Sequence, residues 1–272
     1  MRFAVIAMVG LLGCSEPEVA RAVDAPSPPD RHHAGPIEYE ARSEYSQIRV
    51  RKRGRVRTLL FVDDHGRERV QSKVDLAHPA DLELPYTRMM FASYLVAPTQ
   101  HRVLIVGLGG GAMVHHLRSI DAALEIDVVE IDREVIRVAD RLFDVRDGGR
   151  VHVHARDAIE WFEAAAPTYE AIYLDAFLGD RPGTDATGAP REVRTTRFLE
   201  RVRARLSRGG VAVVNLHHHY DHEADLDAIR DVFPAVYTLQ VPGDGNVIVL
   251  AMRDNEHRDQ DALRAQAAKL LH

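Results

Sequence analysis

Apolar and polar positions alternate along most of the chain in blocks that predict strands and helices in turn. The apolar runs predict seven strands, at 102–107, 125–131, 151–155, 170–175, 211–217, 235–241 and 246–253. The amphipathic segments between them predict helices, at 111–120, 133–143, 158–165, 193–206 and 222–231. The early strands are nearly all apolar, as expected when helices cover both faces of a parallel sheet. The alternation predicts an α/β fold with a doubly wound, mainly parallel sheet.

The last two predicted strands depart from this parallel arrangement. They are joined only by Gly243-Asp244-Gly245, whereas a parallel pair needs a crossover of a dozen or more residues. We therefore expect a C-terminal antiparallel hairpin. The polar segment 254–271 that follows it predicts a helical cap.

The region before the sheet has a different pattern. Short alternating strands broken by glycines over residues 47–73 predict a small antiparallel β unit, to which we assign residues 43–80 as an N-terminal domain. A helix is predicted over 81–96 and is ended by Pro98. Residues 81–272 then form the larger domain.

The first residues resemble a bacterial lipoprotein signal. An apolar run follows Arg2, and the only cysteine of the chain, Cys14, comes after Leu11-Leu12-Gly13 as in a lipobox. We interpret residues 1–13 as a signal peptide and residues 14–42, rich in proline and charge, as a lipid-anchored flexible tether. Residues 15–42 would span about 30 Å if flexible.

The lipobox predicts a location. The residue after the cysteine, Ser15, indicates the periplasmic face of the outer membrane. If the lipobox match is fortuitous, the protein is expected to be cytoplasmic. A single cysteine leaves no intrachain disulfide.

Composition limits the partners. The chain has 272 residues and a formal net charge of −6. Its basic residues are scattered apart from the run at 49–57, which alternates as an exposed strand would. Nucleic acid is therefore not expected as a partner, because its binders usually present a basic face. No later run of about 18 apolar residues predicts a transmembrane helix.

Polar residues and glycines follow the first four predicted sheet strands, where a ligand binds in an open α/β sheet. The candidate ligand-binding residues are the glycines of Gly107-Leu108-Gly109-Gly110-Gly111 and the strand-end acids Glu130, Asp157 and Asp175. Glycines let a ligand approach the main chain. Glu130 lies 19 residues after Gly111, the spacing at which an acid reaches a ribose diol. Taken singly, the loop is also typical of a turn and each acid of a helix cap. Together they predict a nucleoside site.

Four segments resemble successive motifs of the spermidine synthase (polyamine aminopropyltransferase) family. They are "VLIVGLGGGAMVHHL", "VVEIDREVIRVADRLF", "VHVHARDAIEWF" and "YEAIYLDAF". "ELPYTRMM" at 83–90 and Gln71 extend the resemblance to roughly residues 43–253. The predicted sheet likewise resembles the methyltransferase variant of the Rossmann fold.

The resemblance implies roles for individual residues. Glu130 would hold the ribose of the donor, and Asp157 with Ala158 the adenine. Asp175 would be the catalytic base that takes a proton from an attacking amine, with Gln71 and Tyr86 lining the substrate channel. The donor would be decarboxylated S-adenosylmethionine, with a polyamine as acceptor and no metal. The sequence leaves open whether the protein forms a homodimer.

The chain also departs from the family pattern. Ala112 stands where the family has an aspartate that grips the amine of the donor. Asp175-Ala176-Phe177-Leu178 lacks the second acid of the family's D-x-x-D-P. Arg88 replaces a glutamate and would repel a polyamine if it faced the channel. The sequence therefore supports a nucleoside ligand better than a polyamine.

Three functions remain open on the sequence. The first is a spermidine synthase-like transferase. The second is a methyltransferase that uses S-adenosylmethionine itself, for which Ala112 is less of a difficulty. The third is a non-catalytic surface lipoprotein that retains the fold. The run His217-His218-His219 allows a metal site but lacks evident further ligands, so we expect a polar loop there.

Overall fold

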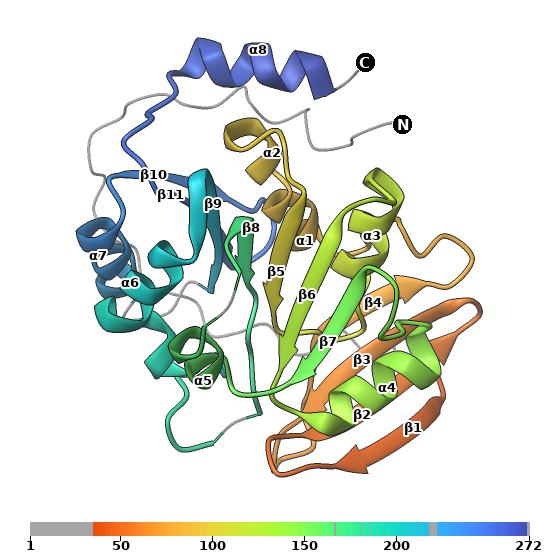
Figure 1. Cartoon of the computed structure of the whole chain (residues 1–272). Coiled ribbons are helices and arrows are strands. Elements are labelled where there is room, and N and C mark those ends of the chain that lie inside the picture. The colour runs from red at the N-terminus through yellow and green to blue at the C-terminus, as the bar shows by residue number, and fades with distance from the viewer. Residues whose placement is uncertain (1–34, 166, 180, 186, 218–221, 271–272) are drawn as a thin grey trace.

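The protein contains two β-sheets, a small antiparallel one and a large mixed one with helices on both faces (Figure 1). The computed structural model describes residues 35–165, 167–179, 181–185, 187–217 and 222–270. The proposed signal peptide, Cys14 and most of the tether lie outside these residues. No helix among them is long and apolar enough to cross a membrane.

The small sheet is built from four antiparallel strands in chain order. They are β1 (Ile37–Arg42), β2 (Gln47–Arg53), β3 (Val56–Val62) and β4 (Glu68–Asp75). The predicted β unit is therefore present, but β1 lies in residues that we had assigned to the tether, so the N-terminal domain begins before residue 43. Most β1 side chains are exposed or half-buried, and Glu38 pairs with Arg57 of β3. A strand with so little buried apolar surface gives a weak hydrophobic signal.

The large sheet has seven strands in the order β10-β11-β9-β8-β5-β6-β7. They are β5 (Arg102–Val106), β6 (Glu125–Glu130), β7 (Val151–Ala155), β8 (Tyr169–Leu174), β9 (Leu206–His217), β10 (Ala235–Gln240) and β11 (Asn246–Met252). Strands β5 to β9 pair in parallel, and β11 lies antiparallel between β9 and β10. The seven-stranded Rossmann-like sheet and its C-terminal antiparallel hairpin are thus confirmed.

Helices occupy the segments between these strands. They are α1 (Pro85–Met90), α2 (Ser93–Val96), α3 (Ala112–Ile120), α4 (Arg133–Phe143), α5 (Ala158–Glu163), a short 3₁₀ helix (Arg191–Arg194), α6 (Thr196–Ala204), α7 (His222–Val232) and α8 (Gln260–Leu270). The single helix predicted over 81–96 is wrong, because it is split into α1 and α2. Between them the backbone N–H groups of Phe91 and Ala92 bond to carbonyls three residues back, which tightens the chain into a turn.

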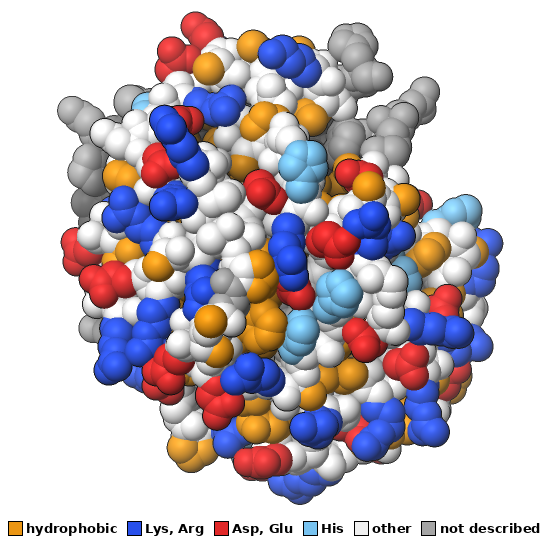
Figure 2. Space-filling model, viewed as in Figure 1, with side chains coloured by type: hydrophobic (Ala, Val, Ile, Leu, Met, Phe, Trp, Pro, Cys, Tyr) orange, Lys and Arg blue, Asp and Glu red, His pale blue; other side chains and the backbone are white. Residues whose placement is uncertain are grey.

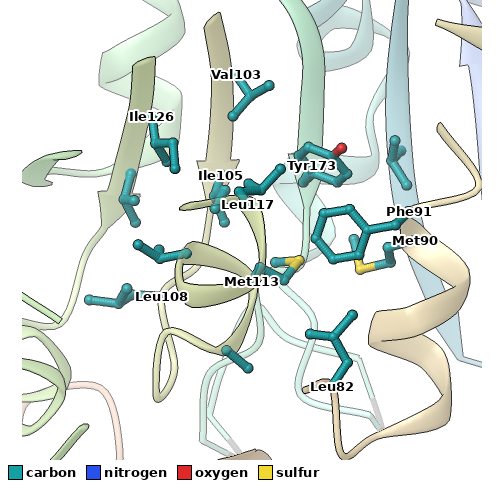
Figure 3. Close-up of a cluster of buried hydrophobic side chains, with 14 of the residues drawn as sticks. Leu82, Met90, Phe91, Val103, Ile105, Leu108, Met113, Leu117, Ile126 and Tyr173 are labelled. Carbon is teal, nitrogen blue, oxygen red and sulfur yellow. The ribbon is translucent and has the colours of Figure 1, made fainter. Parts of the chain in front are cut away.

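Two apolar cores lie on the two faces of the large sheet. Along β5, Val103 and Ile105 face one core while Leu104 and Val106 face the other. Figure 3 shows the first core, in which Ile105 and Leu117 meet side chains from α1 and β8. That core also includes side chains of the small sheet, such as Leu59. The small sheet is therefore packed against the large domain by shared burial. On the face seen in Figure 2, basic and acidic side chains are interspersed.

Candidate functional site

The glycine loop joins β5 to α3 at the carboxyl edge of the large sheet. Gly107, Gly109 and Gly111 all have φ between 54° and 95°, the left-handed region that favours glycine. A Cβ at Gly107 would stand 2.3 Å from the carbonyl oxygen of Asp175, and one at Gly111 would stand 2.2 Å from Cγ2 of Val145. The loop therefore passes tightly against Asp175 at Gly107 and against Val145 at Gly111.

Glu130 ends β6 beside this loop. Its Oε2 accepts a hydrogen bond from the backbone N–H of Leu108 at 2.9 Å, and its Oε1 accepts one from the N–H of Asp132 at 2.8 Å. Burial raises the pKa of Glu130 to about 7, while the two N–H donors act to lower it. A carboxyl group is thus held at the predicted position, in contact with the main chain of the glycine loop.

Asp132 connects this region to the small sheet. Its Oδ2 accepts hydrogen bonds from the hydroxyls of Ser43 and Ser46, and its Oδ1 accepts one from the N–H of Glu134 at the start of α4. Asp132 is buried. The small sheet is therefore hydrogen-bonded to the residue whose N–H holds Glu130, a contact that the sequence did not suggest.

Asp157 and Ala158 lie at the end of β7 and the start of α5. Asp157 is the N-cap of α5, and its carboxylate accepts a hydrogen bond of 2.7 Å from the N–H of Ile159. Both residues also line a cavity of about 380 Å³, together with Gly107 and Glu130. The cap interpretation of Asp157 is thus correct, and the same residue lies in the predicted site. The cavity falls within the usual size range of small-molecule sites.

Asp175 follows β8 at the centre of the sheet. Its Oδ1 accepts a hydrogen bond of 2.8 Å from Nδ2 of Asn215, and the hydroxyl of Tyr86 lies 3.4 Å from its Oδ2. Burial raises the pKa of Asp175 to about 6, and the hydrogen bonds from Asn215 and Tyr86 partly oppose this rise. Burial and the charge of Asp175 hold the pKa of Tyr86 well above its usual value, so the phenol stays protonated.

A second, smaller cavity of about 40 Å³ adjoins the first. Its lining includes Gln71, Tyr86, Ala112 and Asp175, and it shares Gly107, Glu130 and Phe177 with the larger cavity. Every residue predicted for the nucleoside site, the catalytic base or the substrate channel, except Gly110 of the loop, thus lines one cavity or the other. Among the described residues that line the small cavity, Glu130 and Asp175 carry the only carboxyl groups.

The residues that depart from the family pattern are placed as follows. Ala112, the first residue of α3, is buried in the wall of the small cavity. Arg88 is exposed, and its guanidinium donates hydrogen bonds to the backbone carbonyls of Leu82 and Glu83. Arg88 is thus turned back onto its own segment, which relieves the repulsion that the sequence suggested.

The predicted site omitted several residues of the cavities. Asn215 contacts Asp175 from β9, Tyr45 lines the large cavity from the loop between β1 and β2, and Phe177 lines both cavities. Asn215 alone had a visible signal, because it is an amide in the apolar run "VAVVNL". No group of three potential metal ligands gathers within the described part of the chain. His218 and His219 lie outside that part.

The fold and the site together define a class of protein. A seven-stranded sheet with a C-terminal hairpin, a glycine loop and acids after successive strands is the methyltransferase-type Rossmann arrangement. Human methyltransferase-like protein 13, solved in complex with SAH, shares this fold with a TM-score of 0.60 and 23% identity, covering 68% of this chain and 93% of that one.

Comparison with known proteins narrows this class to a family. Residues 83–251 match the model of the spermine/spermidine synthase domain. The polyamine aminopropyltransferase of Vibrio vulnificus is 34% identical over 243 residues, which are 86% of this chain and 77% of that protein. The chain therefore belongs to the spermidine synthase-like family of aminopropyltransferases, which are transferases of polyamine biosynthesis.

Solved structures of similar proteins share the fold over most of the chain. A probable spermidine synthase from Corynebacterium glutamicum has a TM-score of 0.69 at 21% identity, covering 85% of this chain and 87% of that one. A spermidine synthase in complex with the transition state analogue AdoDATO has a TM-score of 0.62 at 15% identity, covering 85% of this chain and 84% of that one.

Proposed function

We propose that this protein binds an adenosyl sulfonium donor and transfers the aminopropyl group of that donor to an amine. The observation that carries the proposal is the position of Asp175. Its Oδ2 lies beside the Tyr86 hydroxyl in the small cavity, which adjoins a cavity large enough for a nucleoside. The raised pKa of Asp175, about 6, suits a general base that works near neutral pH.

The reaction is a displacement at carbon. The nitrogen of the acceptor amine attacks the carbon of the aminopropyl group bonded to the sulfonium sulfur. The C–S bond breaks with its electron pair going to sulfur, which releases methylthioadenosine. The proton lost by the amine passes to Oδ2 of Asp175. Holding donor and amine in line lowers the barrier further.

The nucleoside half of the donor is held in the larger cavity. Glu130 accepts hydrogen bonds from the ribose hydroxyls. The N–H of Leu108 in the glycine loop holds its carboxylate in place for this contact. Asp157 and Ala158 contact the adenine at the start of α5. The lining of the larger cavity by Glu130, Asp157 and Ala158 supports the assignment of an S-adenosyl compound as substrate.

With Ala112 in the cavity wall, two compounds remain as candidates for the donor. The small wall residue carries no carboxylate to bind the amine of decarboxylated S-adenosylmethionine. An alanine there also leaves room for the carboxylate of S-adenosylmethionine, the donor of a methyltransferase. We assign the aminopropyl donor because of the family match, and the choice is open to a direct test.

The test compares the wild type with Ala112→Asp, each supplied with either donor and with putrescine. Mass spectrometry of the products identifies the group transferred. We expect aminopropyl transfer by the wild type, and equal or higher activity in Ala112→Asp because the new acid binds the amine of the donor. Methyl transfer, weakened in Ala112→Asp by repulsion of the donor carboxylate, would indicate a methyltransferase. Transfer of neither group would leave a non-catalytic binding protein as the better account.

We also propose that Cys14 is lipidated and that the protein is exported to the periplasmic face of the outer membrane. Support comes from the position of the only cysteine directly after an apolar run. Adenosyl sulfonium donors are made in the cytoplasm, so an exported enzyme needs a supply of donor outside it. Localisation and activity are therefore tested separately.

A further inference from the structure

A line of hydrogen-bonded polar side chains leads from Asp175 across three strands of the large sheet. Nδ2 of Asn215 donates to Oδ1 of Asp175 at 2.8 Å. Nδ2 of Asn246 donates to Oδ1 of Asn215 at 2.7 Å, and Nε2 of His217 lies 3.1 Å from the same Nδ2. The four side chains follow β8 or belong to β9 and β11, which are neighbours in the sheet.

The two asparagines are costly to bury without partners. Asn246 is 1% exposed and begins the otherwise apolar strand β11, and Asn215 is 4% exposed within the apolar run 211–216 of β9. An unpaired amide in such a place is destabilising, because it loses its hydrogen bonds to water without replacement. Each asparagine is bonded to the next polar group instead, so the line is a connected network rather than a set of separate contacts.

The carboxylate at one end fixes the orientation of every amide. Ionised Asp175 can only accept, so Asn215 must turn its N–H group toward it and its oxygen toward Asn246. Asn246 must then donate to that oxygen. Its second N–H points to Nε2 of His217, which accepts when that nitrogen carries no proton. Donation therefore runs from Asn246 through Asn215 to Asp175 on one side, and from Asn246 to His217 on the other.

We propose that Asn246 and His217 are positioning residues for Asp175. They hold the amide of Asn215 in the orientation that donates to Oδ1, and this leaves Oδ2 directed toward the acceptor amine. Asn246 directly follows the turn between β10 and β11, so the hairpin is coupled to the base. The inference rests on the proposed function for the role of Asp175, but the network itself exists without a substrate.

Two variants of Asn246 remove its donation to Asn215. Asn246→Ala does so without adding a charge, so Asn215 is free to turn its oxygen toward Asp175. Asn246→Asp keeps nearly the same shape, but it replaces the donor by an acceptor and adds a negative charge near Asp175. If orientation matters, the pKa of Asp175 rises in both variants, and the uncharged Asn246→Ala separates loss of the donor from the effect of the added charge.

The readout is the titration of the Asp175 carboxyl, followed by ¹³C NMR in the ligand-free protein and assigned with Asp175→Asn. Tyr86 from α1 and Asn215 from β9 face this carboxyl, Glu130 from β6 lines the same cavity, and the charge of Asp244 in the hairpin turn reaches Tyr86. We expect the midpoint to rise by about 0.5–1 pH unit in Asn246→Ala and further in Asn246→Asp. Exposed Asn255→Ala is the matched control and should leave it unchanged.

His217, which is half-buried, provides a second pair of variants. His217→Gln retains an acceptor oxygen, while His217→Leu does not. We expect the midpoint in His217→Gln to lie closer to the wild-type value than in His217→Leu. Unchanged midpoints in folded Asn246→Ala and His217→Leu would overturn the inference. Shifted midpoints in a protein that transfers no group would contradict the proposed function and leave the network intact.

Discussion

The hydroxyl of Tyr86 and the carboxyl oxygen Oδ2 of Asp175 lie 3.4 Å apart, although 89 residues separate them in the chain. Tyr86 belongs to α1, which packs against β9 and β11, and Asp175 follows the central strand β8. The phenol remains protonated because burial and the nearby carboxylate hold its pKa well above the usual value. Tyr86 can therefore donate to Oδ2 of Asp175, and both residues line the small cavity.

The rate of transfer should depend on pH through Asp175. Burial raises the pKa of this carboxyl from 3.8 to about 6, so the base is ionised above pH 6 and protonated below it. The acceptor attacks as the neutral amine, and the neutral fraction of the amine in solution also rises tenfold per pH unit over this range. At saturating donor, log kcat/KM for the amine should rise with a slope of about two below pH 6 and about one above it.

This profile is measured between pH 5 and 8 with the donor held saturating, so that titration of Glu130 in the free enzyme does not contribute. Asp175→Asn serves as the control, since it should lose the change of slope near pH 6. A single slope across the range in the wild type would mean that Asp175 is not the titrating base.

Removal of the Glu130 carboxylate should weaken nucleoside binding. Glu130→Ala loses charge-assisted hydrogen bonds to the ribose, at a cost of about 1.5–3 kcal/mol in the free energy of binding. Calorimetry with methylthioadenosine measures the change. Glu130→Gln retains an oxygen for a backbone N–H of the loop and isolates the effect of the charge. Exposed Glu200→Ala is the control. Equal affinity in all variants would place the ribose elsewhere.

Replacement of Cys14 should release the protein from membranes. If Cys14 carries the lipid, Cys14→Ser cannot be acylated there and appears in the soluble fraction, because stable membrane anchoring depends on the acyl chains. Ser27→Ala, in the same proline-rich segment, should fractionate like the wild type. Cell fractionation followed by immunoblotting makes the comparison. Membrane association of Cys14→Ser equal to that of the wild type would contradict lipidation at this residue.

The sequence was most informative where burial imposes a pattern. Strands such as β5, β8 and β11 are predicted because nearly all of their side chains are buried, and the hairpin is predicted because three residues cannot form a crossover. Strand β1 was missed because its side chains are mostly exposed. The break between α1 and α2 was missed because Phe91-Ala92 contains neither glycine nor proline.

The candidate site was predictable in part for a related reason. Carboxyl ends of parallel strands meet at one edge, so Glu130, Asp157 and Asp175 could be grouped from strand order alone. Contacts between side chains of elements far apart in the sequence could not be predicted in this way. The tilt of the Asn215 amide toward Asp175 and the turn of Arg88 away from the cavity depend on packing and side-chain rotamers, which have no local sequence signal.

The most direct test of the account uses Asp175→Asn. The rate of methylthioadenosine formation is measured with saturating donor and putrescine, and the affinity of the same variant for methylthioadenosine is measured separately. Asp175 acts on the amine, whereas Glu130 and Asp157 hold the nucleoside. We therefore expect the rate to fall by roughly 10²–10⁴-fold, as is typical for removal of a general base, with an unchanged dissociation constant. A rate near that of the wild type, or a parallel loss of nucleoside affinity, would contradict the assignment of Asp175 as the base.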